Sequence, residues 1–317
     1  MAKLRLLFVL FFSIVTSLAF VSGADAQKTL GSAKAEKVAL CGVLKDPGAY
    51  NHKLLEVTGF VSRGFEDSGL FDPACDSRSY IWVEVGGQGG TGVMYCCGVT
   101  PSKDRPKDLV VEGITVPLTA GDEFTKFDKA LEPKPYGSVI RATLIGRFFS
   151  GKKTKYPNGN EAWTGYGHMG MASLFAIQQV VSVDLPGNPG LDRNSAVEQP
   201  NREREGCDSS YTILTDPSGA QAIALQAKAE TGERAWALDD PKRVAAEELA
   251  KHAKAFKGNA SELKEASKTE SRMIYHWRST KGGLFMIVAN RPYWLSFYAK
   301  DPAKTIWVTA AAYSVCG

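Results

Sequence analysis

Two cysteines stand side by side in the stretch VMYCCGV (93–99), in a chain that holds six. Adjacent thiols could act as a redox pair or as metal ligands, or each could belong to a different structural disulfide. Structural zinc sites use C-x₂₋₄-C pairs and redox sites use C-x-x-C, and Cys96–Cys97 has neither spacing. A bond between them would be strained, because consecutive Cα atoms lie about 3.8 Å apart and disulfides prefer about 4.4–6.8 Å. We interpret both as structural, with separate partners.

The N-terminal residues have the composition of a secretory signal peptide. Lys3 and Arg5 precede the apolar run 6–21, and an A-x-A cleavage site ends at Ala26. A membrane-spanning helix needs about 20 apolar residues, more than this run supplies. We therefore expect cleavage before Gln27, a secreted or periplasmic location, and a mature form without a membrane span.

An oxidising compartment favours disulfides among all six cysteines. Cys207 and Cys316 bracket the second half of the chain, and we expect them to pair. Cys41 and Cys75 would then each take one member of the adjacent pair. The other connectivity, Cys41 with Cys75, leaves the adjacent pair strained or free and stays open, because sequence alone does not fix connectivity. In that case a redox- or metal-handling protein is an alternative function.

The residue pattern in the first half of the mature chain predicts mainly strands. In 138–151, apolar residues alternate with polar ones, which predicts a half-buried strand. Further strands are expected at 54–65, 68–72, 80–85 and 173–185, with a short helix near Cys41, a second helix at 122–132 and a long loop from Lys152. Paired strands with an interposed helix predict a small, partly open β-barrel.

The second half reads as a mixed domain. Strands are expected at 211–214, 220–229, 273–279, 283–290, 293–299 and 305–315. One main helix begins with Asp240 as N-cap before Pro241 and ends at Gly258. This pattern predicts an α+β domain with an antiparallel sheet and one main helix. The predicted divisions are the signal peptide 1–26, an N-terminal arm 27–37, an OB-like β-barrel domain 38–185, a proline- and glycine-rich linker 186–206 and the α+β domain 207–317.

Three motifs in the first half carry a resemblance. They are P-x-x-Y-x-x-K-x-x-x-V-x-G from Pro47 to Gly59, G-R-F at 146–148 and Y-G-H at 166–168. With them, residues 38–184 resemble uncharacterised exported bacterial proteins with a domain similar to an OB-fold of the tRNA-anticodon-binding type. The resemblance implies binding through one sheet face and its loops, and it implies no activity.

A loop rim of this barrel is the predicted ligand site. It combines the turn after the first strand with a basic, aromatic loop, and the candidate residues are Arg63, Glu66, Lys152, Lys153, Tyr156, Trp163, Tyr166 and His168. The simplest interpretation of His168 is a hydrogen bond that fixes a glycine-rich turn. The alternative is an enzyme with its site around His168. The motifs of serine hydrolases, zinc proteases and nucleotide-binding loops are absent, so no catalytic residue, metal or cofactor is predicted.

The net charge of +4 falls to +3 when Lys3, Arg5 and Asp25 leave with the signal peptide. That is too little to favour nucleic acid, so the expected partner is a saccharide or a peptide. The aromatic residues of 293–298 could form a stacking surface, although core packing is the default interpretation. A third functional hypothesis treats 207–317 as an inhibitor-like or envelope-assembly module.

Overall fold

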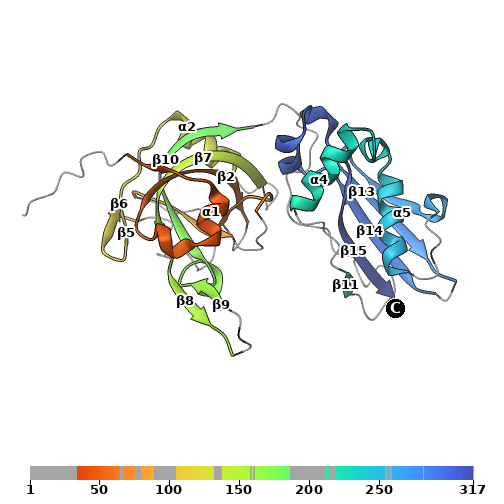
Figure 1. Cartoon of the computed structure of the whole chain (residues 1–317), viewed down its shortest axis with the longest axis horizontal. Helices are drawn as coiled ribbons and strands as arrows, with labels where there is room; N and C mark the ends of the chain where they lie inside the picture. Colours follow the sequence, from red (N-terminus) through yellow and green to blue (C-terminus); the bar gives the residue numbers. More distant parts are fainter. Residues whose placement is uncertain are drawn as a thin grey trace, which may run out of the picture. The chain divides into compact units, whose positions relative to one another are not determined.

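The computed structural model describes residues 34–64, 68–75, 80–88, 105–131, 138–157, 159, 161–185, 211–213, 219–253, 256, 259–280 and 282–316 (Figure 1). Residues 35–317 form one compact unit. Several predicted features lie outside the described residues, namely the predicted signal peptide, the predicted linker, Cys96, Cys97 and Cys207. The predictions about them, and the domain boundaries, stay predictions.

A closed five-stranded barrel occupies the first half of the chain. Its strands follow the order β2 (Leu54–Arg63), β3 (Ser68–Phe71), β4 (Ile81–Val85), β10 (Ser173–Asp184) and β7 (Ser138–Phe149), and β7 pairs back onto β2. The β4–β10 pair is parallel and the other pairs of the ring are antiparallel. The short β1 (Glu36–Lys37) adds to β2. The predicted strands are confirmed, and the barrel is closed rather than partly open.

Apolar residues that alternate along each barrel strand fill the barrel interior. Val57, Leu144 and Phe175 are at most 1% exposed in this core. Gly146 on β7 lets the neighbouring strand approach, because a Cβ there would lie 2.5 Å from the carbonyl oxygen of Ala176. Two helices complete the core, α1 (Leu40–Lys45), which is followed by the 3₁₀ turn η1 (Pro47–Tyr50), and α2 (Asp122–Ala130).

Two hairpins extend from the barrel. The first, β5 (Leu109–Val111) with β6 (Ile114–Val116), packs with Trp82 in a second apolar cluster. The second, β8 (Lys152–Lys155) with β9 (Glu161–Thr164), projects beyond the barrel (Figure 1). The prediction of an unbroken loop from Lys152 was therefore wrong, since part of it pairs as a hairpin. The segment between β9 and β10 contains the 3₁₀ turn η2 (His168–Gly170).

A five-stranded antiparallel sheet occupies the second half. Its order is β11 (Tyr211–Ile213), β15 (Val308–Cys316), β14 (Leu284–Asn290), β13 (Arg272–Arg278) and β12 (Lys264–Lys268). The helices α4 (Gly219–Glu230) and α5 (Pro241–His252) share one apolar core with it. Short 3₁₀ segments connect these elements: η3 (Ala235–Leu238), η4 (Ala260–Glu262), η5 (Tyr293–Tyr298) and η6 (Pro302–Lys304). The predicted fold class, an OB-like barrel followed by an antiparallel sheet with a main helix, is confirmed.

Three local predictions in this half were wrong. Residues 220–229 form the helix α4 rather than a strand, because alanine and glutamine favour helices and Ala222, Gln226 and Ala229 share its buried face. Residues 293–298 form the 3₁₀ segment η5 rather than a strand. The main helix α5 is N-capped by Asp240 as predicted, but it ends at His252 rather than at Gly258.

The aromatic residues of η5 are buried or partly buried in one apolar cluster. Tyr293 is 1% exposed and clusters with Phe60 and Val139 of the barrel. Phe297 stacks edge-on against Phe60, with ring centroids 5.5 Å apart. Core packing, the default interpretation, therefore describes this stripe, and it leaves little of it for a stacked ligand.

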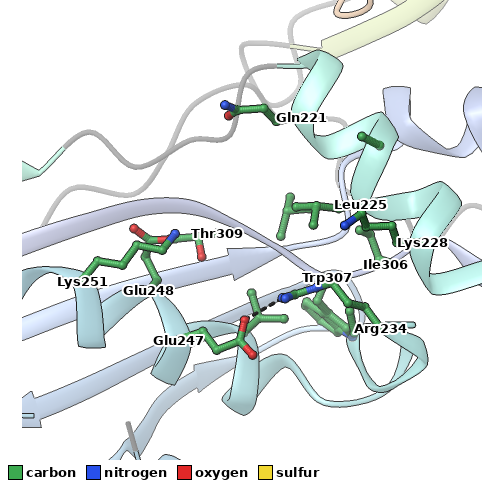
Figure 2. Close-up of a pocket in the computed structure, with 14 residues that line it drawn as sticks. Gln221, Leu225, Lys228, Arg234, Glu247, Glu248, Lys251, Ile306, Trp307 and Thr309 are labelled. Carbon is green, nitrogen blue, oxygen red and sulfur yellow. Dashed lines mark hydrogen bonds and ion pairs between the residues drawn. The ribbon is translucent and has the colours of Figure 1, made fainter. Parts of the chain in front are cut away.

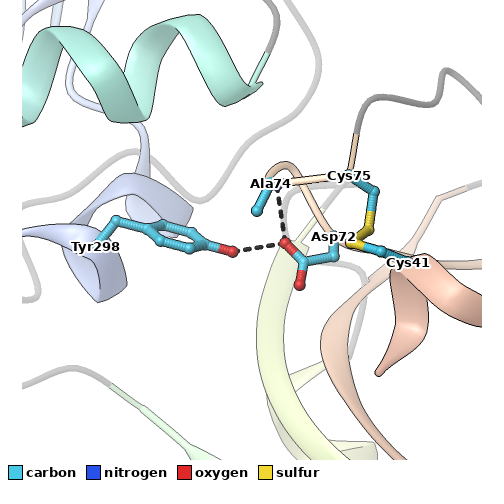
Figure 3. Close-up of a disulfide and its surroundings, with 5 residues drawn as sticks. All are labelled: Cys41, Asp72, Ala74, Cys75 and Tyr298. Atoms are coloured by element: carbon cyan, nitrogen blue, oxygen red, sulfur yellow. Dashed lines mark hydrogen bonds between the residues drawn. A yellow bond between two sulfur atoms is a disulfide. The ribbon is translucent and has the colours of Figure 1, made fainter. Parts of the chain in front are cut away.

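A disulfide joins Cys41 on α1 to Cys75 after β3, across 34 residues of sequence (Figure 3). The preferred pairing, in which each took a member of the adjacent pair, was wrong, and the alternative connectivity holds. The loop that contains Cys75 also presents Asp72, whose carboxylate accepts hydrogen bonds from the Ala74 amide at 2.9 Å and from the Tyr298 hydroxyl at 2.5 Å. The disulfide is compatible with the expected oxidising compartment.

Among the helices that the structure describes, none is long and apolar enough to cross a membrane. The apolar run 6–21 is outside that set.

Replacing both Cys41 and Cys75 by serine should lower the free energy of unfolding by about 2–4 kcal/mol, because the bond closes a loop of roughly 35 residues in the unfolded chain. Urea denaturation of the mature protein measures this loss. Disulfide mapping of the wild type should recover a peptide pair that joins Cys41 to Cys75. A loss below about 0.5 kcal/mol, or a peptide that links Cys41 to Cys96 or Cys97, would contradict the assignment.

Candidate functional site

Three side chains from distant segments meet at one end of the barrel. The Glu112 carboxylate accepts a hydrogen bond from the Tyr166 hydroxyl at 2.5 Å through Oε1, and its Oε2 lies 2.6 Å from Nε2 of His52. His52 precedes β2, Glu112 stands in the β5–β6 turn and Tyr166 follows β9. We call these three residues the rim cluster. No two of them are closer than 54 residues in the sequence.

The backbone at two of these residues is in a conformation that is costly for a side chain. His52 has φ +62° and Glu112 has φ +49°. Because Val111 pairs with Ile114, Glu112 and Gly113 form a two-residue hairpin turn with positive φ at both positions. Such turns favour Asn-Gly or Asp-Gly, so a glutamate there is strained by about 1 kcal/mol or more. Strain of this kind concentrates at functional sites.

Hydrogen bonding fixes the charge state of the cluster. The Tyr166 hydroxyl, and then His52, hold the pKa of the Glu112 carboxyl below its usual range. Burial, and then the hydrogen bond to Glu112, raises the pKa of Tyr166 well above its usual range. The phenol thus stays a donor and the carboxylate stays an acceptor at neutral pH. His52 must carry its proton on Nε2 to donate to Glu112.

Buried aromatic rings pack against the rim cluster and the turn beside it. Phe149 is fully buried, and its ring centroid lies 5.7 Å from that of His52 and 6.3 Å from that of Tyr166. The turn after Tyr166 packs closely on Trp82, because a Cβ on Gly167 would lie 2.7 Å from that ring. Only glycine fits this position, which also has φ +73°.

The β8–β9 hairpin carries the basic and aromatic side chains beside the cluster. Its register places Lys153 opposite Trp163. Lys153 forms an ion pair with Glu161 at 2.6 Å, and Trp163 packs on Gly48 of η1. Lys152 and Lys155 are exposed, and neither forms an ion pair with a residue that the structure describes. Met169 in η2 and Met171 just after it are 80% and 59% exposed.

The structure brings most, but not all, of the predicted site residues together. The β8–β9 hairpin and the turn after it carry six of them: Lys152, Lys153, Tyr156, Trp163, Tyr166 and His168. His168 is half-buried and makes contacts of its own. Glu66 lies outside the described residues.

Arg63 lies elsewhere. It is buried and pairs with Asp128 on α2 at 2.8 Å. Arg63 ends β2 whereas His52 precedes it, so roughly 30 Å of extended strand separates them. The predicted rim is therefore divided between the two ends of β2, and the hairpin end holds the cluster.

Neither Glu112 nor His52 was among the site residues predicted from the sequence. The signal that could have found Glu112 is the pattern V-V-E-G-I-T-V (110–116), in which two short apolar runs flank a two-residue turn ending in glycine. The turn could be recognised this way, but its neighbours in space could not.

One further group has the composition of a metal site. Ligand atoms of Cys41, Asp72 and Cys75 lie within 4.8 Å of one another. Both sulfur atoms are bonded to each other, and Asp72 is engaged by Tyr298 and Ala74 (Figure 3). As it stands, this group is a structural disulfide with a bound carboxylate.

Comparisons with known proteins add little. No protein-family model and no curated protein matches the chain. Among solved structures, one described as "putative aspartyl-tRNA synthetase from Leishmania major Friedlin" is similar, with a TM-score of 0.23 and 9% identity. The match covers 82% of this chain, and the chain spans about half (48%) of the length of that structure. A likeness this slight carries no argument.

Glu112→Asn tests whether the glutamate strains the β5–β6 turn, in which it has a positive φ. Asparagine adopts positive φ readily, so this variant should be as stable as the wild type or up to about 1 kcal/mol more stable. Glu112→Gln, which keeps the strain, is the matched control and should be no more stable than the wild type. Urea denaturation measures both. An asparagine variant less stable by more than about 1 kcal/mol would mean that the carboxylate mainly stabilises the fold.

The rim cluster also predicts a pH dependence. Because the folded pKa of Glu112 is lowered, its contribution is fully present above the unfolded pKa and is lost as pH falls through the folded one. The carboxylate is 42% exposed, so the contribution should be below about 1 kcal/mol. Unfolding free energies measured from pH 6 to pH 3 should fall less steeply for Glu112→Gln than for the wild type. Parallel curves would refute the cluster's role in this range.

Proposed function

We propose that the chain is an exported binding protein whose barrel holds an anionic saccharide beside the rim cluster and the β8–β9 hairpin. The observation that carries this proposal is the rim cluster itself. Three segments of the chain converge there, two of them through strained residues, at the base of a projecting basic and aromatic hairpin.

The strand order of the barrel supports a loop-based site. OB-folds, which the first half of the chain resembles, bind oligosaccharides and oligonucleotides through the face of their second and third strands and through two loops. The connection from β7 to β10 corresponds to one of these loops, and it contains the β8–β9 hairpin. The face is covered in this chain, since Trp82 and Glu84 on β4 are at most 1% exposed. Ligand contact therefore falls to the loop.

The balance of donors and acceptors supports an anionic ligand. Both oxygens of Glu112 are occupied by Tyr166 and His52. Lys152 and Lys155 are exposed, each with ammonium donors to offer. Tyr156 adds an aromatic ring beside them, of the kind that packs on sugar faces. Nucleic acid is disfavoured, because the mature net charge is only +3 and the sheet face is covered.

The enzyme hypothesis gains a different candidate residue. His52 is hydrogen-bonded to Glu112, an arrangement that would orient it as a general base. Both His52 and Glu112 are more than two-fifths exposed, which does not favour the desolvated setting of most acid–base sites. Binding remains the better-supported function. The redox alternative depends on Cys96 and Cys97, outside the described residues.

Calorimetric titration of the mature protein with tetragalacturonate, and with neutral maltotetraose as its counterpart, tests the proposal. Tetragalacturonate should bind more tightly, and Lys152→Ala/Lys155→Ala should weaken it at least about 10-fold, because two charge-assisted hydrogen bonds are lost. Lys264→Ala/Lys268→Ala on β12 removes the same charge elsewhere and should have no effect. Equal binding of the two sugars, or tighter binding of a 15-residue oligothymidylate, would refute an anionic-saccharide site.

A further inference from the structure

A groove in the second half of the chain lies between α4 and α5, over the beginning of β15. It encloses about 510 Å³, within the range of small-molecule sites, which is roughly 300–1,000 Å³. Figure 2 shows side chains from both helices and from β15 pointing into it. It is unrelated to the rim cluster, none of whose residues line it.

The middle of the groove is apolar. Leu225 projects from α4, and Ile306 and Trp307 precede β15 (Figure 2). Val244 lies on α5. Val244, Ile306 and Trp307 are at most 8% exposed. An apolar molecule over this surface would be removed from water on several sides, at about 25 cal/mol for each Å² buried.

Hydrogen bonds hold the floor of the groove in place. The Trp307 amide donates to the Ala237 carbonyl at 2.8 Å, and the Ile306 amide donates to Oε1 of the fully buried Gln226 at 3.0 Å. The guanidinium of Arg291 lies 4.8 Å from the centre of the Trp307 ring. The groove is thus pre-formed, as small-molecule sites usually are.

Charged side chains line the groove on both sides. Lys228 and Arg234 lie on the side of Trp307, with Glu247, and Lys251 and Glu248 lie near Thr309 (Figure 2). This arrangement places polar groups at the edges of an apolar surface, which suits an amphipathic molecule rather than a wholly apolar one.

Each carboxylate oxygen of the groove already has a cationic neighbour, and the cations of the groove retain donors. Glu248 contacts Lys251 at 2.7 Å and His252 at 2.8 Å, one with each oxygen. Glu247 contacts Arg234 at 2.6 Å with one oxygen and Arg243 at 3.9 Å with the other. Lysine has three donors and arginine has five, so one carboxylate partner does not exhaust either. The groove therefore offers lysine and arginine donors to an incoming anion.

We propose that this groove binds a small amphipathic organic acid. Its apolar body lies over Leu225, Val244 and Trp307, and its carboxylate accepts hydrogen bonds from Arg234. Arg234 is favoured over Lys251 because its planar donors match a carboxylate and its side chain is 29% exposed against 64% for Lys251. A medium-chain fatty acid combines such an apolar body with such a carboxylate.

Calorimetric titration of the full mature chain with decanoate, and with decanol as a neutral counterpart of equal chain length, tests this. Decanoate should bind at least about 10-fold more tightly than decanol. This comparison needs no variant and so does not depend on the folding of one. Absence of decanoate binding at millimolar concentration, or equal binding of the two molecules, overturns the proposal.

Two variants locate the site. Arg234→Gln should weaken decanoate binding about 10-fold and leave decanol binding unchanged, whereas Leu225→Gln should weaken both. Ala227→Gln, on the exposed side of α4, is the matched control for helix and charge and should alter neither. Far-ultraviolet circular dichroism confirms that each variant is folded. Unchanged decanoate affinity in folded Arg234→Gln places the acid elsewhere and overturns the assignment.

Discussion

The pairing of β2 with β7 is the constraint on which the rest of the first half depends. All ten residues of β2, from Leu54 to Arg63, pair with β7, and its last four also pair with β3. One strand therefore belongs to both sides of the sheet, which closes the barrel and removes its free edges. The same pairing determines which segments lie at each end of β2. Residues before Leu54 contact the β8–β9 hairpin that follows β7, whereas Arg63 pairs with Asp128 of α2 at the opposite end.

Closure also explains why the outer face of β4 is sealed. Ile81 and Val83 point into the barrel, so alternation turns Trp82 and Glu84 outward, where the β5–β6 hairpin covers them. Glu84 accepts a hydrogen bond from the Trp82 indole at 3.2 Å and lies 3.6 Å from the equally buried Arg105. Removing one member of a buried ion pair costs about 3–5 kcal/mol. The β5–β6 hairpin is thus packed as part of the folded barrel, and its turn places Glu112 in the rim cluster.

Local patterns predicted what is locally determined. The barrel strands and α2 follow from alternation and helical spacing, and the N-cap of α5 follows from Asp240 and Pro241. The helix α4 was missed because its alanines do not separate helix from strand by hydrophobicity, and only propensity distinguishes them. The Glu112 contacts were beyond reach, and the Cys41–Cys75 bond could be stated only as the second of two connectivities. In both cases the contact joins residues that only the closed barrel brings together.

The two candidate sites share one electrostatic design. At the rim, each oxygen of Glu112 has one partner, Tyr166 or His52, and in the groove each oxygen of Glu247 and Glu248 lies near a cation. These carboxylates hold their partners in place. In the groove, Arg234 and Lys251 are therefore held before the ligand arrives, so less conformational entropy is lost on binding. Each site would select anions through the remaining donors of its lysine and arginine side chains.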